Sequence, residues 1–194
     1  MQPPAEMVHW LFATGFLLLG LVLVAEPIVG AEVWRMRRWR VYLWPGLAFL
    51  LGLLMWPVMA FYTNSTIHMI AHGAWAQALM LAGAAELALA RGKIHHPAWR
   101  LFTAIGLFVS GAAFLVHEQN DWWFARSAFL HHLLGWTLVG GALITLAAFI
   151  RPRSLVLQSG FAIVMIALSV MLYCDRDVAP VFGRLAPQAG TPHR

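Results

Sequence analysis

Cysteine and charge are scarce in this 194-residue sequence, and each scarcity excludes a class of protein. The single cysteine, Cys174, rules out a disulfide framework and a metal site built from several thiolates. Only 11% of the residues are charged, whereas 61% are hydrophobic and the mean hydropathy is +0.71. Soluble domains of this size do not have that balance, so the composition indicates an integral membrane protein in contact with the lipid bilayer.

Several functional motifs are also missing. The sequence has no phosphate-binding loop, no dinucleotide fingerprint and no serine nucleophile elbow. We find no pair of broken helices of the kind that marks transporters with inverted repeats. The net charge of +5 does not indicate nucleic-acid binding, because the basic residues cluster in short connections between apolar segments.

Six apolar segments are long enough to cross a bilayer as helices, which takes about 20 residues each. They predict an all-α, six-transmembrane-helix bundle that forms one domain over residues 1–177, with a disordered tail at 178–194. Residues 1–10 contain no Lys or Arg and no small-residue cleavage site, so we expect the first segment to be a retained helix. The predicted segments are Val8–Ile28, Tyr42–Tyr62, Thr66–Ala90, Trp99–Val116, Ser127–Ile150 and Leu155–Tyr173.

The basic residues predict the orientation of the bundle. The first, third and fifth connections carry four, three and two positive charges, at residues 35–40, 91–100 and 151–153. Because cytoplasmic loops carry the excess of Lys and Arg, these three connections should be cytoplasmic and both termini extracytoplasmic. We expect a multi-pass protein of a bacterial-type inner or plasma membrane.

With this topology, histidines gather near the extracytoplasmic ends of the helices. In the third segment Asn64, His68 and His72 are spaced i, i+4, i+8, which places them on one stripe with about 6 Å between successive members. Two imidazoles at i and i+4 are a common chelating pair. An imidazole at membrane depth is costly without a partner, and a metal ion is the simplest common partner.

The other helices add three more candidate ligands. His117, at the end of the fourth segment, shares a face with Ser110 and Ala113, whose small side chains allow close helix contact. Of the adjacent pair His131 and His132, only one can easily face the bundle, and the sequence favours His131 because it shares a face with Ser127 and Gly135. The predicted metal ligands are therefore His68, His72, His117, His131 and His9, the last at the start of the first segment.

Two carboxylates follow His117 in the predicted extracytoplasmic connection. Glu118 and Asp121 are the candidate catalytic residues, because either could orient an imidazole, act as a ligand or serve as a general base; the alternative is that both are solvated loop residues. Glu86 should lie near the cytoplasmic end of its helix, too far from the histidines to be a ligand. His95 and His96 precede Pro97 and indicate a solvated loop.

The second half of the chain resembles a known family. The stretch 129–134, with its adjacent His131 and His132, follows a polar loop that begins at His117, and this pattern is similar to the transmembrane protein 45 family of eukaryotic polytopic proteins. The resemblance covers about residues 5–150 and implies that His9, His72, His117 and His131 act as a set. It implies no reaction. This chain has fewer helices than the family and a longer interval between His117 and His131.

The sequence is compatible with three functions. The first is a Zn or Cu site opening to the extracytoplasmic side, which could serve a metal-dependent enzyme with a lipid-like or small-molecule substrate. The second is a b-type cytochrome for electron transfer, in which two histidines on different helices ligate one haem b. The third is a cofactor-free accessory subunit of a larger membrane complex.

Overall fold

The computed structural model describes residues 5–62, 66–116, 125–152 and 154–174, and every regular element in these ranges is helical. Six of the helices are long and apolar enough to cross a membrane, which gives the chain the architecture of a multi-pass integral membrane protein. The long helices are α1 (Ala5–Val29), α3 (Leu43–Tyr62), α4 (Thr66–Ala90), α5 (Leu101–Val116), α6 (Ala125–Ile150) and α7 (Leu155–Cys174).

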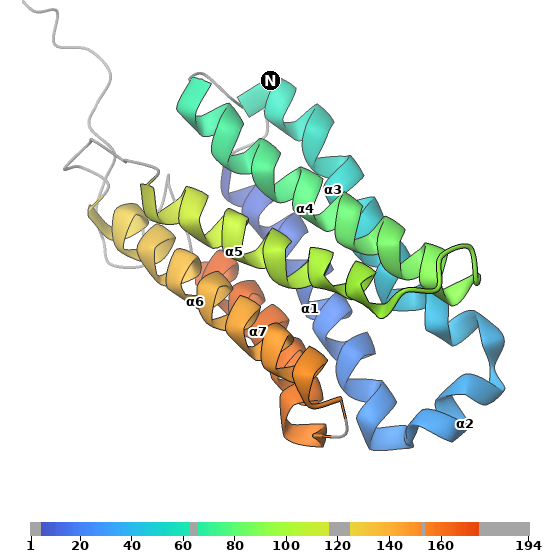
Figure 1. Cartoon of the computed structure of the whole chain (residues 1–194). Helices are drawn as coiled ribbons and strands as arrows, with labels where there is room; N and C mark the ends of the chain where they lie inside the picture. The colour runs from blue at the N-terminus through green and yellow to red at the C-terminus, as the bar shows by residue number, and fades with distance from the viewer. Residues whose placement is uncertain (1–4, 63–65, 117–124, 153, 175–194) are drawn as a thin grey trace, which may run out of the picture.

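The six long helices pack as a ring that follows the order of the chain (Figure 1). Each helix packs against the next, and α1 packs against both α3 and α7, which closes the ring. The centre of the ring is apolar. Its most buried large side chains are Phe16, Leu19, Phe114, Leu134, Leu138, Met165 and Leu168.

Glycines set the closest helix contacts in this ring. A methyl group on Gly52 of α3 would lie 2.5 Å from the backbone oxygen of Ala76 on α4. One on Gly83 of α4 would lie 2.5 Å from the backbone oxygen of Pro45 on α3. Because lipid tails are as apolar as leucine, helices in a membrane associate mainly through such close packing of small residues.

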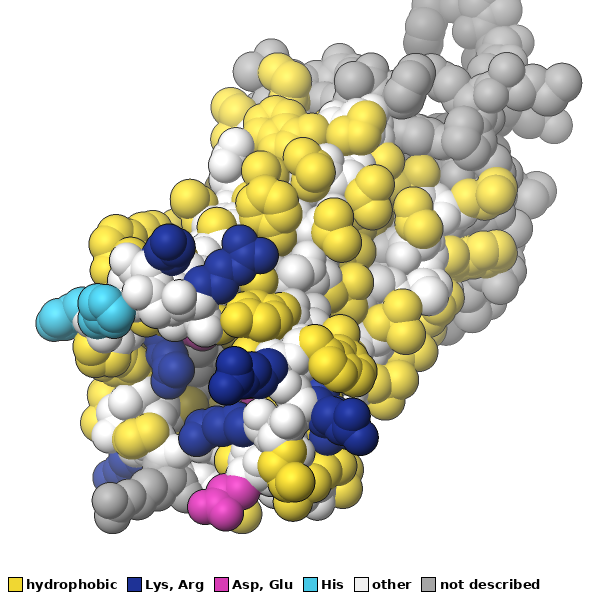
Figure 2. Space-filling model, turned by 90° about the vertical axis from the view of Figure 1, so that its right-hand side faces the viewer, with side chains coloured by type: hydrophobic (Ala, Val, Ile, Leu, Met, Phe, Trp, Pro, Cys, Tyr) yellow, Lys and Arg dark blue, Asp and Glu magenta, His cyan; other side chains and the backbone are white. Residues whose placement is uncertain are grey.

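The three basic connections lie together at one end of the bundle, which we call the basic end (Figure 1). Figure 2 shows Lys and Arg side chains gathered over this end, next to an apolar surface. The opposite end, where α1, α4 and α6 begin and α5 and α7 end, we call the histidine end. The grouping of the basic loops at one end agrees with the sequence prediction.

The first basic connection is more ordered than the sequence indicated. Two short helices, α2 (Ala31–Met36) and the 3-10 helix η1 (Arg38–Tyr42), replace the expected loop. The guanidinium carbon of Arg40 lies 5.2 Å from the ring centre of Trp34 and 5.9 Å from that of Trp39. Trp34 is buried, and these cation–π contacts help to hold α2 and η1 together.

The predicted helix boundaries agree with the structure to within three residues, the largest difference being Val8 against Ala5. The predicted fourth segment began at Trp99, whereas a 3-10 turn, η2 (Pro97–Arg100), precedes α5. Helix α3 continues through Pro57. The expected tail, residues 178–194, lies outside the described residues.

Candidate functional site

Helix α6 holds one histidine inside the bundle. His131 lies on the same buried stripe as Leu134, Leu138 and Ala142, at helical spacing, and only 5% of its surface is exposed. His132 is turned by about 100° from it, as adjacent helical residues are, and is exposed. The inward residue of this pair is therefore His131, the one that the sequence favoured.

His72 on α4 packs against the same aromatic ring as His131. The ring centre of Phe114, on α5, lies 5.8 Å from that of His72 and 5.6 Å from that of His131. Phe114 is buried and His72 is half-buried. Three neighbouring helices thus bring two imidazoles into contact with one phenyl ring at the histidine end.

Below these imidazoles, toward the basic end, lies an aromatic layer made of Phe16, Trp75 and Phe114. Phe16 on α1 stacks on Trp75 of α4, with ring centres 5.0 Å apart and planes within 8°. Trp75 meets Phe114 edge to face, with ring centres 5.2 Å apart. Such pairs contribute about 0.5–1.5 kcal/mol each beyond the area that they bury. The layer joins α1, α4 and α5 and fixes the inner boundary of the histidine end.

The structure places only part of the predicted ligand set. His9 is half-buried on α1 at the histidine end. His117, Glu118, Asp121 and the side chain of His68 lie outside the described residues. In the part of the chain that is described, no three His, Cys, Asp or Glu side chains come together as a metal site requires. Two of the predicted ligands, His72 and His131, contact the same side chain, Phe114.

The residues that organise this site were not identified from the sequence. Phe114 and Trp75 are aromatic residues in apolar helices, and such residues carry no signal that separates a core position from a site. Their importance follows from the ring contacts, which depend on how α1, α4, α5 and α6 pack. The one available signal was spacing, because Trp75 follows His72 by three residues and so shares its face.

His95, His96 and Glu86 lie at the basic end, far from the imidazoles inside the bundle, as the sequence predicted. His95 and His96 are exposed, as expected, and the His96 side chain accepts a hydrogen bond from the backbone amide of Ala98 at 3.2 Å. Glu86 on α4 is 14% exposed and lies 3.8 Å from the Nε atom of Arg100, which is 62% exposed. This ion pair ties α4 to the turn before α5.

We expect Arg100→Ala to destabilise the protein by about 1–2 kcal/mol, because it leaves the Glu86 carboxylate without its cation. The value is below that of a fully buried pair because water screens the exposed arginine. Thermal unfolding in detergent measures the loss. Adding Glu86→Gln should recover most of it, and a double variant as unstable as Arg100→Ala alone would contradict this account.

The chain matches no family model, no curated protein and no solved structure. The resemblance to the transmembrane protein 45 family therefore stays a prediction, and the function has to be argued from the geometry of the bundle.

Proposed function

We propose that this protein is a multi-pass membrane protein that binds one transition-metal ion, Zn or Cu, at the histidine end of its bundle. The observation that carries the proposal is the burial of His131, together with its contact and that of His72 with Phe114. Imidazoles in the interior of a membrane bundle are costly and generally functional. A pair of them from two helices is a natural start for a nitrogen-ligated site.

Two described imidazoles are fewer than a stable site needs. Structural zinc sites have four ligands, and catalytic sites have three protein ligands and an open position. His68, one turn before His72 on α4, and His117, just after α5, are the residues that would complete the set, with His9 on α1 as a further donor. Bound zinc would supply an activated water or a Lewis acid, and Glu118 or Asp121 would then be the base.

The basic end of the bundle supports an orientation for this site. Because positive residues mark the cytoplasmic side, the histidine end would face the extracytoplasmic side. A metal site there would meet ions and substrates that arrive from outside the cytoplasm or along the outer leaflet.

A second candidate function is that of a b-type cytochrome, which is favoured by the placement of His72 and His131 on different helices. His72 and His131 come from different helices, α4 and α6, and both face the bundle interior. Ligation of a single haem b by two histidines uses such an arrangement. The protein would then transfer electrons, and its remaining histidines would not be needed for cofactor binding.

Elemental analysis and an absorption spectrum of the detergent-purified protein test these proposals. We expect about one Zn or Cu per chain and no Soret band. A Soret band with sharp α and β bands after reduction would replace the metal-ion proposal with the cytochrome. A protein with neither metal nor haem would refute both and leave an accessory subunit of a membrane complex.

A further inference from the structure

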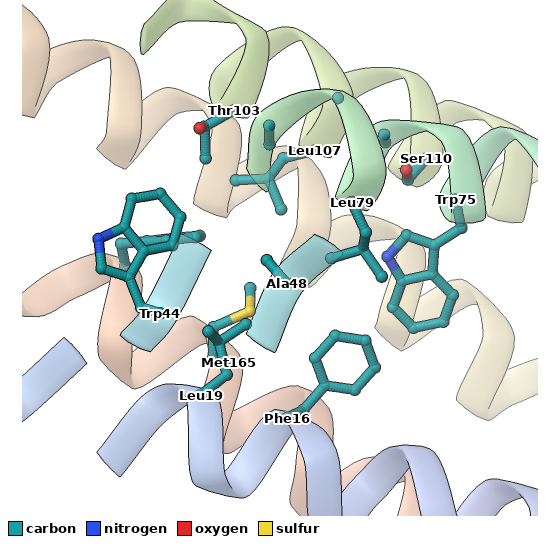
Figure 3. A pocket seen from close by; sticks show the side chains of 14 residues that line it. Phe16, Leu19, Trp44, Ala48, Trp75, Leu79, Thr103, Leu107, Ser110 and Met165 are labelled. Atoms are coloured by element: carbon teal, nitrogen blue, oxygen red, sulfur yellow. The ribbon is translucent and has the colours of Figure 1, made fainter. Parts of the chain in front are cut away.

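A small cavity lies inside the helix ring, on the basic-end side of the aromatic layer (Figure 3). Side chains from α1, α3, α4, α5 and α7 line it, and nearly all of them are apolar. The space open to the centre of a water-sized sphere is about 30 Å³. A water molecule occupies a sphere of about 10–15 Å³, so the cavity has room for at least one.

Two hydroxyl groups in the wall of this cavity have no hydrogen-bond partner among the described residues. Ser110 is fully buried and Thr103 is 7% exposed, and both belong to the face of α5 that lines the cavity. A serine or threonine inside a helix can satisfy its hydroxyl by donating to the carbonyl four residues earlier. Thr145 does this in the same protein, donating to the carbonyl of Gly141 at 2.8 Å, whereas Ser110 and Thr103 do not.

The end of the cavity nearest the aromatic layer offers a second polar group. Figure 3 shows the indole nitrogen of Trp75 facing the interior of the cavity, on the same side as Ser110. A guest at this end would meet a hydroxyl, which both donates and accepts, and an indole N–H, which only donates. These groups suit a small molecule that accepts one hydrogen bond and takes part in another.

We propose that the cavity holds an ordered water molecule bound to the Ser110 hydroxyl and the Trp75 indole N–H, beneath the aromatic layer. Water fits both the volume and the donors, and a buried hydroxyl without a partner is costly in an apolar environment. Thr103, on the same face of α5, could bind a second water.

The binding of water makes this cavity different from an apolar void, which stays dry and takes up xenon. A high-resolution crystal structure, determined with and without xenon pressure, separates the two. We expect density for a water within hydrogen-bond distance of the Ser110 Oγ atom, and no xenon there. An empty cavity, or xenon at that position, would overturn the proposal.

A pair of serine variants provides an independent test in solution. Ser169 on α7 is also buried and without a partner among the described residues, but it does not line the cavity. Ser169→Ala removes a buried hydroxyl that has no hydrogen-bond partner, so it should raise the Tm. Ser110→Ala removes a hydroxyl that binds the water, so it should not raise the Tm. We expect Ser110→Ala to melt about 2–4 °C below Ser169→Ala.

Equal melting temperatures, or a higher one for Ser110→Ala, would mean that the Ser110 hydroxyl has no hydrogen-bond partner either. That result would refute the water site. The proposal does not depend on the metal site at the histidine end. Ser110→Ala should therefore leave the metal content of the purified protein unchanged.

Discussion

Replacing His72 and His131 together by glutamine is expected to abolish metal binding, from about one ion per chain to none. Both imidazoles contact Phe114, so the double replacement removes the two candidate ligands that the described structure places against one side chain. Glutamine keeps most of the volume and a polar end but is a much weaker ligand for Zn or Cu. Elemental analysis of the purified variant measures the effect.

His95 and His96 provide the matched control for this experiment. They are also two histidines, but they are exposed and lie at the basic end. The double variant His95→Gln/His96→Gln should keep its metal. If both double variants retained the metal, or if both lost it while eluting as folded protein, the ion would not be bound at the histidine end.

Replacing Gly52 by valine is expected to destabilise the bundle by about 3 kcal/mol, the upper part of the usual range for overpacking. A Cβ at this position would lie 2.5 Å from the backbone oxygen of Ala76 and 2.9 Å from the backbone nitrogen of Met80, both on α4. Backbone atoms cannot move aside as a flexible side chain can, so α3 and α4 would have to separate. Thermal unfolding in detergent measures the change.

Gly46 is the control for Gly52, because it lies on the same helix but has no atom within 4 Å of its Cβ position. Valine there should change the stability by less than about 1 kcal/mol, since it only alters local helix propensity. Equal losses for the two variants would mean that the α3–α4 contact does not limit stability.

The sequence alone was sufficient to predict that this is a membrane protein and where its six long helices lie. Long apolar runs between charged connections specify spanning helices, because a bilayer leaves the backbone no other way to satisfy its hydrogen bonds within one segment. This is why Thr66–Ala90 was predicted at the residues where α4 begins and ends. The segment with α2 and η1 was missed because cation–π contacts of Arg40, and not apolar periodicity, help to hold it.

Only part of the candidate site could be predicted from the sequence. Helical geometry was enough to favour His131 over His132, since small residues share the face of His131. The sequence could not show that His72 and His131 both contact Phe114, because this depends on the relative rotation of α4, α5 and α6. Ser110 was noticed only as a small residue that permits close packing, and its unpaired hydroxyl emerged from the structure.

By itself, then, the sequence determined an apolar six-helix membrane protein with its basic loops on one side and histidines near the other. Hydrophobicity and charge determine how each residue interacts with water and with the bilayer. Both can therefore be evaluated one residue at a time from the sequence. The tertiary structure alone decided which side chains of different helices are in contact and where a cavity remains. Those outcomes depend on contacts between distant residues, such as Phe16 with Trp75 and Gly52 with Ala76, which only the packing of the whole bundle fixes.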